Sequence, residues 1–72
     1  MSRYYFDIEN GHPYRDDVGE DLPDDEAAWR TAIWLTRDME SNLLPGGAWN
    51  LEVRDRRQKP IFRITVKAER LR

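Results

Sequence analysis

Residues 3 to 11 read Arg-Tyr-Tyr-Phe-Asp-Ile-Glu-Asn-Gly, and this stretch decides how the fold begins. Its apolar side chains recur at every second position, which is typical of a strand with one buried face. Asn10-Gly11 follows at once, and both residues tolerate the positive φ angles of a tight hairpin. The stretch therefore predicts a first strand that leads directly into a hairpin. The predicted buried face is formed by Tyr4, Phe6 and Ile8.

The length of the hairpin loop decides which face of the sheet the returning chain presents. A three-residue loop over residues 10–12 places Tyr14 opposite Ile8 on the core face, whereas a two-residue loop turns Tyr14 toward solvent. We favour the three-residue loop. Pro13 cannot donate a hydrogen bond to a ladder, so the returning strand is expected to be short and at a sheet edge. The prediction is a first hairpin over about residues 3–18.

Residues 22 to 28, Leu-Pro-Asp-Asp-Glu-Ala-Ala, carry the chemistry of a helix start. Asp24 can cap the first free N–H groups, and the acids that follow complement the positive end of the helix dipole. Pro45-Gly46-Gly47 ends the pattern, because Gly permits a left-handed cap and Pro cannot continue the ladder. We therefore expect one helix over residues 24–44.

The predicted helix has one apolar stripe, which Trp29 and Ile33 widen on one side. Trp34 falls on the opposite, polar face, where it lies beside Arg30 and Arg37. A large aromatic side chain is unusual on such a face, so this position is a candidate for contact with another molecule. The residues of the expected buried stripe are Ala28, Ala32, Leu35, Met39 and Leu43.

Residues 48–67 contain two further alternating runs, joined by a polar turn at residues 55–60. The element order is then ββαββ, which predicts an α+β fold with a four-stranded antiparallel sheet and one helix packed on one face. The whole chain, residues 1–72, is expected to form a single domain, with residues 69–72 as a frayed tail. The apolar positions of the second hairpin are Trp49, Leu51, Val53, Phe62, Ile64 and Val66.

The size of the chain makes its stability marginal. A chain of 72 residues buries only about 60% of its extended surface, and the hydrophobic gain nearly cancels the ordering entropy. There is no cysteine, hence neither a disulfide nor a thiolate metal site. Three Trp, three Tyr and two Phe supply too much core for a disordered segment, although 36% of the residues are charged. The shortage of buried surface favours self-association.

The sequence contains few side chains that are typical of catalytic sites. It has one His and no Cys, and its glycines match no phosphate-binding loop, so we predict neither enzyme activity nor a cofactor. His12 is expected to be an exposed loop residue. The acidic stretch from Asp16 to Glu26 could attract a hard cation such as Ca²⁺, but turns and a helix cap account for several of its carboxylates. This favours a structural role over a metal site.

The hydropathy pattern contains no membrane segment. No apolar run approaches the roughly 18 residues that a membrane span needs. Met1 leads straight into the first strand, without the apolar region of a signal peptide. We expect a soluble cytoplasmic protein with no membrane partner.

Protein contact is the function that the leftover apolar residues favour. Trp34 with Arg30 and Arg37 forms the helix part of the predicted interface, since exposed aromatic residues flanked by Arg are typical of interfaces. The partner is either a different protein or a second copy, as a homodimer. Residues predicted on the open sheet face complete the set: Tyr5, Arg54, Ile61 and Arg63.

The alternative function is nucleic-acid binding by the second hairpin. Residues 48–72 hold eight Lys or Arg against three acids, and Tyr5 on the same sheet face could stack a base. A pI near 5.3 for the whole chain favours a solvated mixed-charge face instead. The basic residues in question are Arg54, Arg56, Arg57, Lys59, Arg63 and Lys67.

Three stretches of the chain resemble a family of short bacterial proteins that is catalogued as a domain of unknown function. They are residues 3–8, residues 15–24 and residues 53–55. Members typically begin with a Met-x-Arg-Tyr-Phe-Phe strand, carry an Asp-x-x-Gly-x-Glu-Leu-Pro-Asp turn into one helix, and end with an Asp-x-x-Gly-Arg hairpin. Gln58 stands where the last Gly is usual. The resemblance implies the ββαββ order and a cytoplasmic setting, and it transfers no activity.

Overall fold

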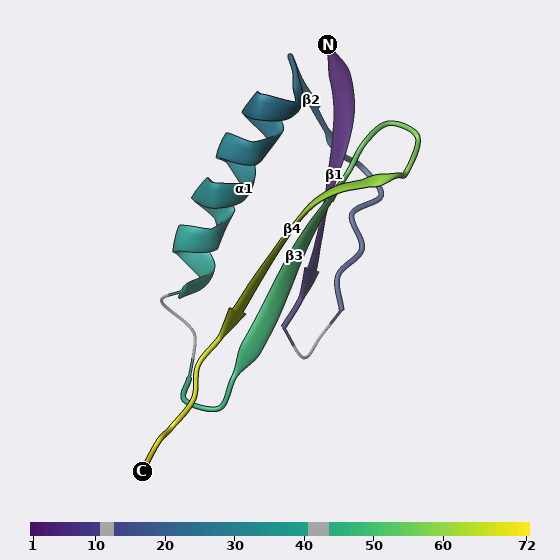
Figure 1. Ribbon diagram of the computed structural model, residues 1–72. Helices are drawn as coiled ribbons and strands as arrows, with labels where there is room; N and C mark the ends of the chain where they lie inside the picture. Colours follow the sequence, from purple (N-terminus) through teal and green to yellow (C-terminus); the bar gives the residue numbers. More distant parts are fainter. Residues whose placement is uncertain (11–12, 41–43) are drawn as a thin grey trace.

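The computed structural model describes residues 1–10, 13–40 and 44–72, and Figure 1 shows one helix lying along one face of a twisted sheet. The sheet has the strand order β2-β1-β3-β4, and every neighbouring pair is antiparallel. The predicted α+β fold with ββαββ order is confirmed. The elements are β1 (Ser2–Glu9), β2 (Glu20–Leu22), α1 (Asp25–Glu40), β3 (Ala48–Arg54) and β4 (Pro60–Lys67).

The first hairpin has the predicted register but a different second strand. Ile8 and Tyr14 exchange two backbone hydrogen bonds of 2.9 and 2.7 Å, as the three-residue loop requires. The chain then leaves the sheet, because the Asp16 side chain, and not a backbone carbonyl, accepts the hydrogen bond from the Phe6 N–H, and it returns only at β2, beyond the predicted limit of residue 18. Tyr14 has a pairing partner on one side alone and is 57% exposed, so its expected burial in the core is wrong.

Helix α1 begins as predicted and ends earlier. The Asp24 carboxylate accepts a hydrogen bond of 2.9 Å from the N–H of Ala27, which is the expected N-cap. Leu44 lies outside the helix, in a turn where its carbonyl accepts a hydrogen bond from the N–H of Gly47. Of the residues named above, Gly11, His12, Leu43 and the side chain of Met39 lie outside the described part of the chain.

The core lies between α1 and the faces of β1 and β3. Ala28 and Ala32 are fully buried, and their small side chains let the helix approach the sheet closely. Thr36 is also buried, and its hydroxyl is satisfied there because it donates a hydrogen bond of 2.8 Å to the carbonyl of Ala32. The buried sheet residues are Tyr4, Phe6, Trp49, Leu51 and Val53.

Tyr4 ties the first strand to the start of the helix. Its hydroxyl donates a hydrogen bond of 2.7 Å to Oδ1 of Asp25. The hydrogen bond to the Asp25 carboxylate, together with burial, raises the pKa of Tyr4 to about 12. The phenol therefore stays protonated, and remains able to donate, well above neutral pH.

A β-bulge places Ile61 on the core side of the sheet. Val53 faces Phe62 but Arg54 faces Pro60, so β4 contains one extra residue at this point. The extra residue reverses the alternation, and Ile61 packs against the hydrophobic core. Its predicted place on the open face is therefore wrong.

The β3–β4 turn closes with Gln58, a residue other than glycine, in a left-handed conformation. Asp55 Oδ1 accepts hydrogen bonds from the N–H groups of Arg57 and Lys59, at 2.8 and 3.0 Å. These bonds to Lys59 and Arg57 hold the pKa of the Asp55 carboxyl below its usual value. Gln58 takes a φ of 67°, a left-handed conformation that costs roughly 1–2 kcal/mol in a residue with a Cβ.

Gln58→Gly is expected to raise the free energy of unfolding by about 0.5–1 kcal/mol. Glycine adopts the left-handed conformation without the steric cost of a Cβ. Part of this gain is lost, because glycine gives the unfolded chain more conformational entropy. Urea unfolding measures it as a higher midpoint at an unchanged slope. Gln58→Ala is the control, because it removes the same side chain and keeps the Cβ; an equal gain in both variants would contradict the explanation.

Candidate functional site

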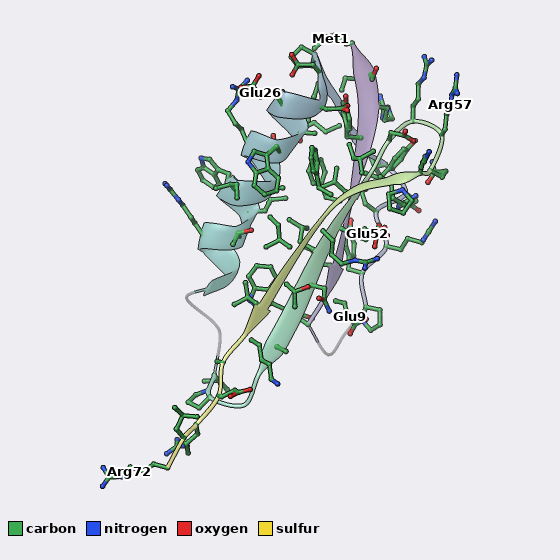
Figure 2. The ribbon with its side chains drawn as sticks, in the orientation of Figure 1. Met1, Glu9, Glu26, Glu52, Arg57 and Arg72 are labelled. Atoms are coloured by element: carbon green, nitrogen blue, oxygen red, sulfur yellow. The ribbon has the colours of Figure 1, made fainter. Side chains whose placement is uncertain are left out.

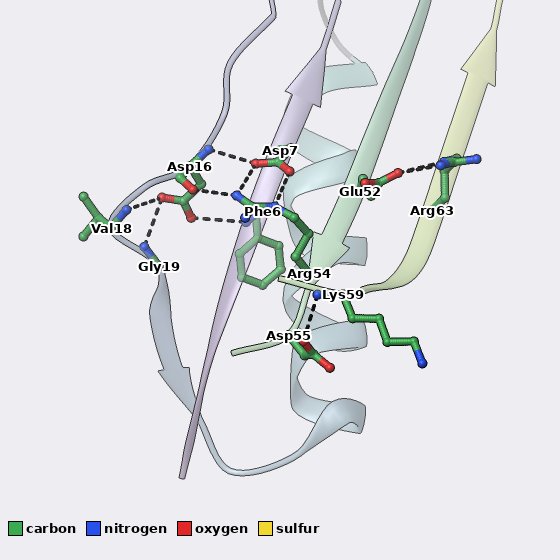
Figure 3. A network of polar contacts seen from close by, with 10 residues as sticks. All are labelled: Phe6, Asp7, Asp16, Val18, Gly19, Glu52, Arg54, Asp55, Lys59 and Arg63. Atoms are coloured by element: carbon green, nitrogen blue, oxygen red, sulfur yellow. Dashed lines mark hydrogen bonds and ion pairs between the residues drawn. The ribbon is translucent and has the colours of Figure 1, made fainter. Parts of the chain in front are cut away.

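Arg54 is the centre of a buried ion-pair network on the sheet face that α1 leaves uncovered (Figure 3). Its guanidinium donates to both carboxylate oxygens of Asp7, at 2.6 Å from Nε to Oδ2 and 2.9 Å from Nη2 to Oδ1. Nη2 also donates to the backbone carbonyl of Asp16, at 2.7 Å. Arg54 is only 3% exposed, so its predicted role as a surface contact is wrong. The guanidinium carbon lies 4.9 Å from the centroid of the Tyr5 ring, which leaves Tyr5 half-buried beside it.

The Asp16 carboxylate organises the loop between the hairpin turn and β2. It accepts hydrogen bonds from the N–H groups of Phe6, Val18 and Gly19, at 3.0–3.1 Å. The Phe6 N–H faces the edge of β1 that no strand covers at this point, so Asp16 takes the place of a strand neighbour. Gly19 has a φ of 77°, and a Cβ on it would lie 2.8 Å from Cγ of Arg3. Only glycine fits this turn.

The network keeps its members ionised. Burial opposes the charge on Asp7, but the hydrogen bonds from Arg54 and from the Asp16 N–H outweigh it, and the pKa of Asp7 is lowered. Burial likewise opposes the charge on Asp16, and the three backbone donors outweigh it, so its pKa is lowered too. The hydrogen bond to Asp7 raises the pKa of Arg54 against the effect of burial. These groups hold the fold together and present no free charge for a reaction.

A shallow groove of about 630 Å³, lined by both polar and apolar side chains, extends from this network over the rest of the open sheet face. Arg63 donates to Glu52 Oε2 at 2.6 Å from Nη2, and the Thr65 hydroxyl donates to Asn50 Oδ1 at 2.7 Å. Arg63 is exposed as predicted, but it is paired with Glu52. With Arg54 buried and Ile61 on the core side, the structure does not bring the four predicted sheet residues together into one surface.

The structure does bring the predicted helix residues together. Trp34 is 70% exposed, and it lies beside Arg30 and Arg37 in one shallow hollow on the solvent side of α1. A second hollow on the other side of Trp34 runs between α1 and β2. We call the first hollow the outer helix face; it is lined by Trp29, Arg30, Ile33, Trp34 and Arg37.

Sequence reasoning missed two members of the outer helix face. The helical wheel assigns Trp29 and Ile33 to the buried side, yet they are 40% and 36% exposed. The reason is that α1 packs mainly over β3 and β2, which leaves its flank toward β4 uncovered. Their wheel positions at the margin of the stripe were the signal that could have identified them.

The carboxylates of the acidic stretch have separate structural roles. Asp21 pairs with Arg3, Asp24 caps the helix, Asp25 accepts the Tyr4 hydroxyl and Glu26 pairs with Arg30. Among the described residues, no group of three or more His, Cys, Asp or Glu is placed to hold a metal ion. In the same part of the chain, no helix has both the length and the apolar character to cross a membrane.

Comparison with known proteins gives a family and no activity. No curated protein and no solved structure matches this chain. A family model matches residues 3–67, nearly the whole chain, and that family is described as a domain of unknown function. The motifs that carried the resemblance are accounted for by the fold: the Asp16 loop, the Gly19 turn and the Asp24 cap. The chain belongs to the domain-of-unknown-function family DUF6894.

Proposed function

We propose that this protein is a small non-catalytic interaction or regulatory module that binds a protein partner through the outer helix face. The observation that carries the proposal is Trp34, which leaves 70% of its surface in solvent although it is among the largest apolar side chains in the chain. Tryptophan with neighbouring arginines is the composition that dominates binding energy at protein interfaces. The proposal includes a cytoplasmic location and requires neither a cofactor nor a membrane.

The charge around Trp34 indicates the chemistry of the partner. Arg30 and Arg37 rim the outer helix face, so a partner with an apolar centre and acidic side chains around it would complement it. Arg30 now pairs with Glu26 at 3.2 Å, but both side chains are more than two-thirds exposed. An exposed pair of this kind contributes little, and Arg30 can exchange Glu26 for a partner carboxylate at small cost.

Trp34→Ala is expected to reduce partner capture more than tenfold without changing the melting temperature. The experiment compares immobilised wild type with the variant in an extract of the native host, and quantifies each captured protein. Tyr14→Ala is the matched control, because Tyr14 is an exposed aromatic residue outside the outer helix face. A protein captured equally by all three baits would not bind through this face, and if every captured protein behaved so, the proposal would be wrong.

A second candidate function is nucleic-acid binding by the tip of the β3–β4 hairpin. Arg56, Arg57 and Lys59 are exposed there, and Figure 2 shows Arg57 projecting beyond the sheet. Three other basic residues of this hairpin are already paired with carboxylates: Arg54, Arg63 and Lys67. Salt separates the two functions, because phosphate contacts weaken steeply with added salt and an aromatic-centred interface does not. Binding of labelled DNA or RNA that salt abolishes would favour this candidate.

A further inference from the structure

The outermost strand β4 has an uncovered inner face. Its inward side chains Phe62, Ile64 and Val66 pack against the core but are only partly buried, because α1 lies mainly over β3 and β2. Of the three, Phe62 contacts the helix through an aromatic side chain, because its ring centroid lies 5.3 Å from that of Trp29. We call these three side chains the β4 shelf. They form half of an apolar layer, beside the exposed flank of the helix.

The outer edge of β4 also offers free backbone groups. Ala68 exchanges hydrogen bonds with Gly46 and Gly47, so its backbone groups point toward the β3 side. Backbone groups alternate in direction along a strand, and those of Arg63, Thr65 and Lys67 therefore point away from β3. In the described chain no strand lies on that side. Pro60 and the bulge at Ile61 protect one end of the strand and Lys67 protects the other, and the stretch between them carries a single charged side chain, that of Arg63.

The exposed area of the chain leaves room for an interface of ordinary size. A monomer of 8.6 kDa is expected to expose about 4,700 Å². This chain exposes 5511 Å², and the extended C-terminal residues contribute part of the excess of about 800 Å². Standard protein interfaces bury about 800 Å² on each partner.

We propose that two copies of this chain pair antiparallel along β4, with the two-fold axis at Ile64. In this register Arg63 faces Thr65 of the partner subunit, and Phe62 faces Val66 of the partner subunit. A register centred on Thr65 would place Arg63 opposite Lys67 of the partner subunit, and one centred on Arg63 would place two arginines opposite each other. Like charges directly opposite are unfavourable, so the Ile64 register is selected.

The pairing covers both the free backbone groups at the edge of β4 and the β4 shelf. The outward backbone groups of each β4 find partners, and the two sheets join into one continuous sheet. Because the axis runs through the sheet, both helices lie on the same side, where the two β4 shelves meet and complete one apolar layer. A second copy fits this edge better than an unrelated strand, because the strand is its own complement in both charge and side-chain size. Trp34, Arg30 and Arg37 lie on the solvent side of α1 and take no part in the pairing, whereas Trp29 borders the β4 shelf through its contact with Phe62.

Thr65→Lys and Thr65→Glu test the register by a change of sign. Thr65 is exposed, and each substitution faces Arg63 of the partner subunit twice in the dimer. We expect sedimentation equilibrium on the full chain to show wild-type dimers, roughly tenfold weaker dimers for the Lys variant and several-fold tighter ones for the Glu variant. Thr65→Pro removes an outward N–H without touching the β3 ladder, and it is expected to be a folded monomer.

A single introduced cysteine reports the axis directly, because the native chain has none. Ile64→Cys places two thiols at a close pair on the axis, and mild oxidation is expected to cross-link it. Thr65→Cys is the control, which stays uncross-linked in this register. Preferential cross-linking of Thr65→Cys, or a wild type that is monomeric over a hundredfold concentration range, would overturn the proposal. So would a dimer that Trp34→Ala dissociates and Thr65→Pro does not; loss of Trp34-dependent capture alone would leave the β4 dimer standing.

Discussion

Arg54→Ala is expected to lower the free energy of unfolding by about 3–5 kcal/mol, which removes most of the stability of a chain this small. The substitution leaves the Asp7 carboxylate, only 18% exposed, without the guanidinium that neutralises it. It also removes the hydrogen bond to the carbonyl of Asp16, so β3 loses its link to the loop before β2. Urea unfolding followed by circular dichroism measures the loss, and we expect a variant that is largely unfolded without denaturant.

Arg63→Ala is the matched control for Arg54→Ala. It removes the same side chain from the neighbouring strand and breaks a pair with Glu52 of the same length, 2.6 Å. The Arg63 side chain is 66% exposed against 4% for Arg54, so solvent screens its pair and the expected loss is below about 1 kcal/mol. Equal losses in the two variants would show that burial does not determine the contribution of Arg54.

Asp16→Ala is expected to cost about 2–4 kcal/mol, because three backbone N–H groups lose a charged acceptor in one step. Of the three N–H groups, that of Phe6 is affected most, because Phe6 is a buried residue and water replaces the lost acceptor less easily there. Asp17→Ala is the control: it is an exposed neighbour with the same charge, and it is expected to change the stability by less than about 0.5 kcal/mol. The comparison is made by urea unfolding at neutral pH.

The same carboxylate makes the stability depend on pH in the acid range. Its pKa is lower in the folded chain than the ordinary value of 3.8, so the unfolded state binds a proton first. The stabilisation is complete above pH 3.8 and is lost as the pH falls below it, through the pKa of the folded state. Wild type and Asp17→Ala are therefore expected to lose stability more steeply below pH 4 than Asp16→Ala. Parallel acid limbs for all three would contradict the assignment.

The alternation of side chains predicted most of the fold. Tyr4 and Phe6, or Trp49 and Leu51, show which face of each strand is buried, and Asp24 marks the start of the helix correctly. These are local signals, in which the residue itself determines the structure around it. Ile61 escaped prediction, because a β-bulge depends on how two strands meet and leaves no trace in the alternation of one.

The candidate site was also predicted only where its residues depend on local signals. Trp34 was identified because a wheel position on a polar face follows from the helix alone, and it is exposed as expected. Arg54 has the same alternation as Arg63, so the sequence presents the two as equivalent. Only the three-dimensional pairing of Arg54 with Asp7, 47 residues away, distinguishes a buried charge from an exposed one. The exposure of Trp29 depends on which strands α1 packs against, and the sequence of the helix alone does not determine that.

The central position of β1 has a kinetic consequence. This first strand lies between β2 and β3, and its main partner comes more than forty residues later in the chain, with Phe6 opposite Val53. Such a topology has a high contact order, since a long loop must close before the central pair of strands gains any stability. The β3–β4 hairpin can pair locally, but an isolated hairpin is marginally stable, so we expect one cooperative folding step that waits until β1 and β3 have met.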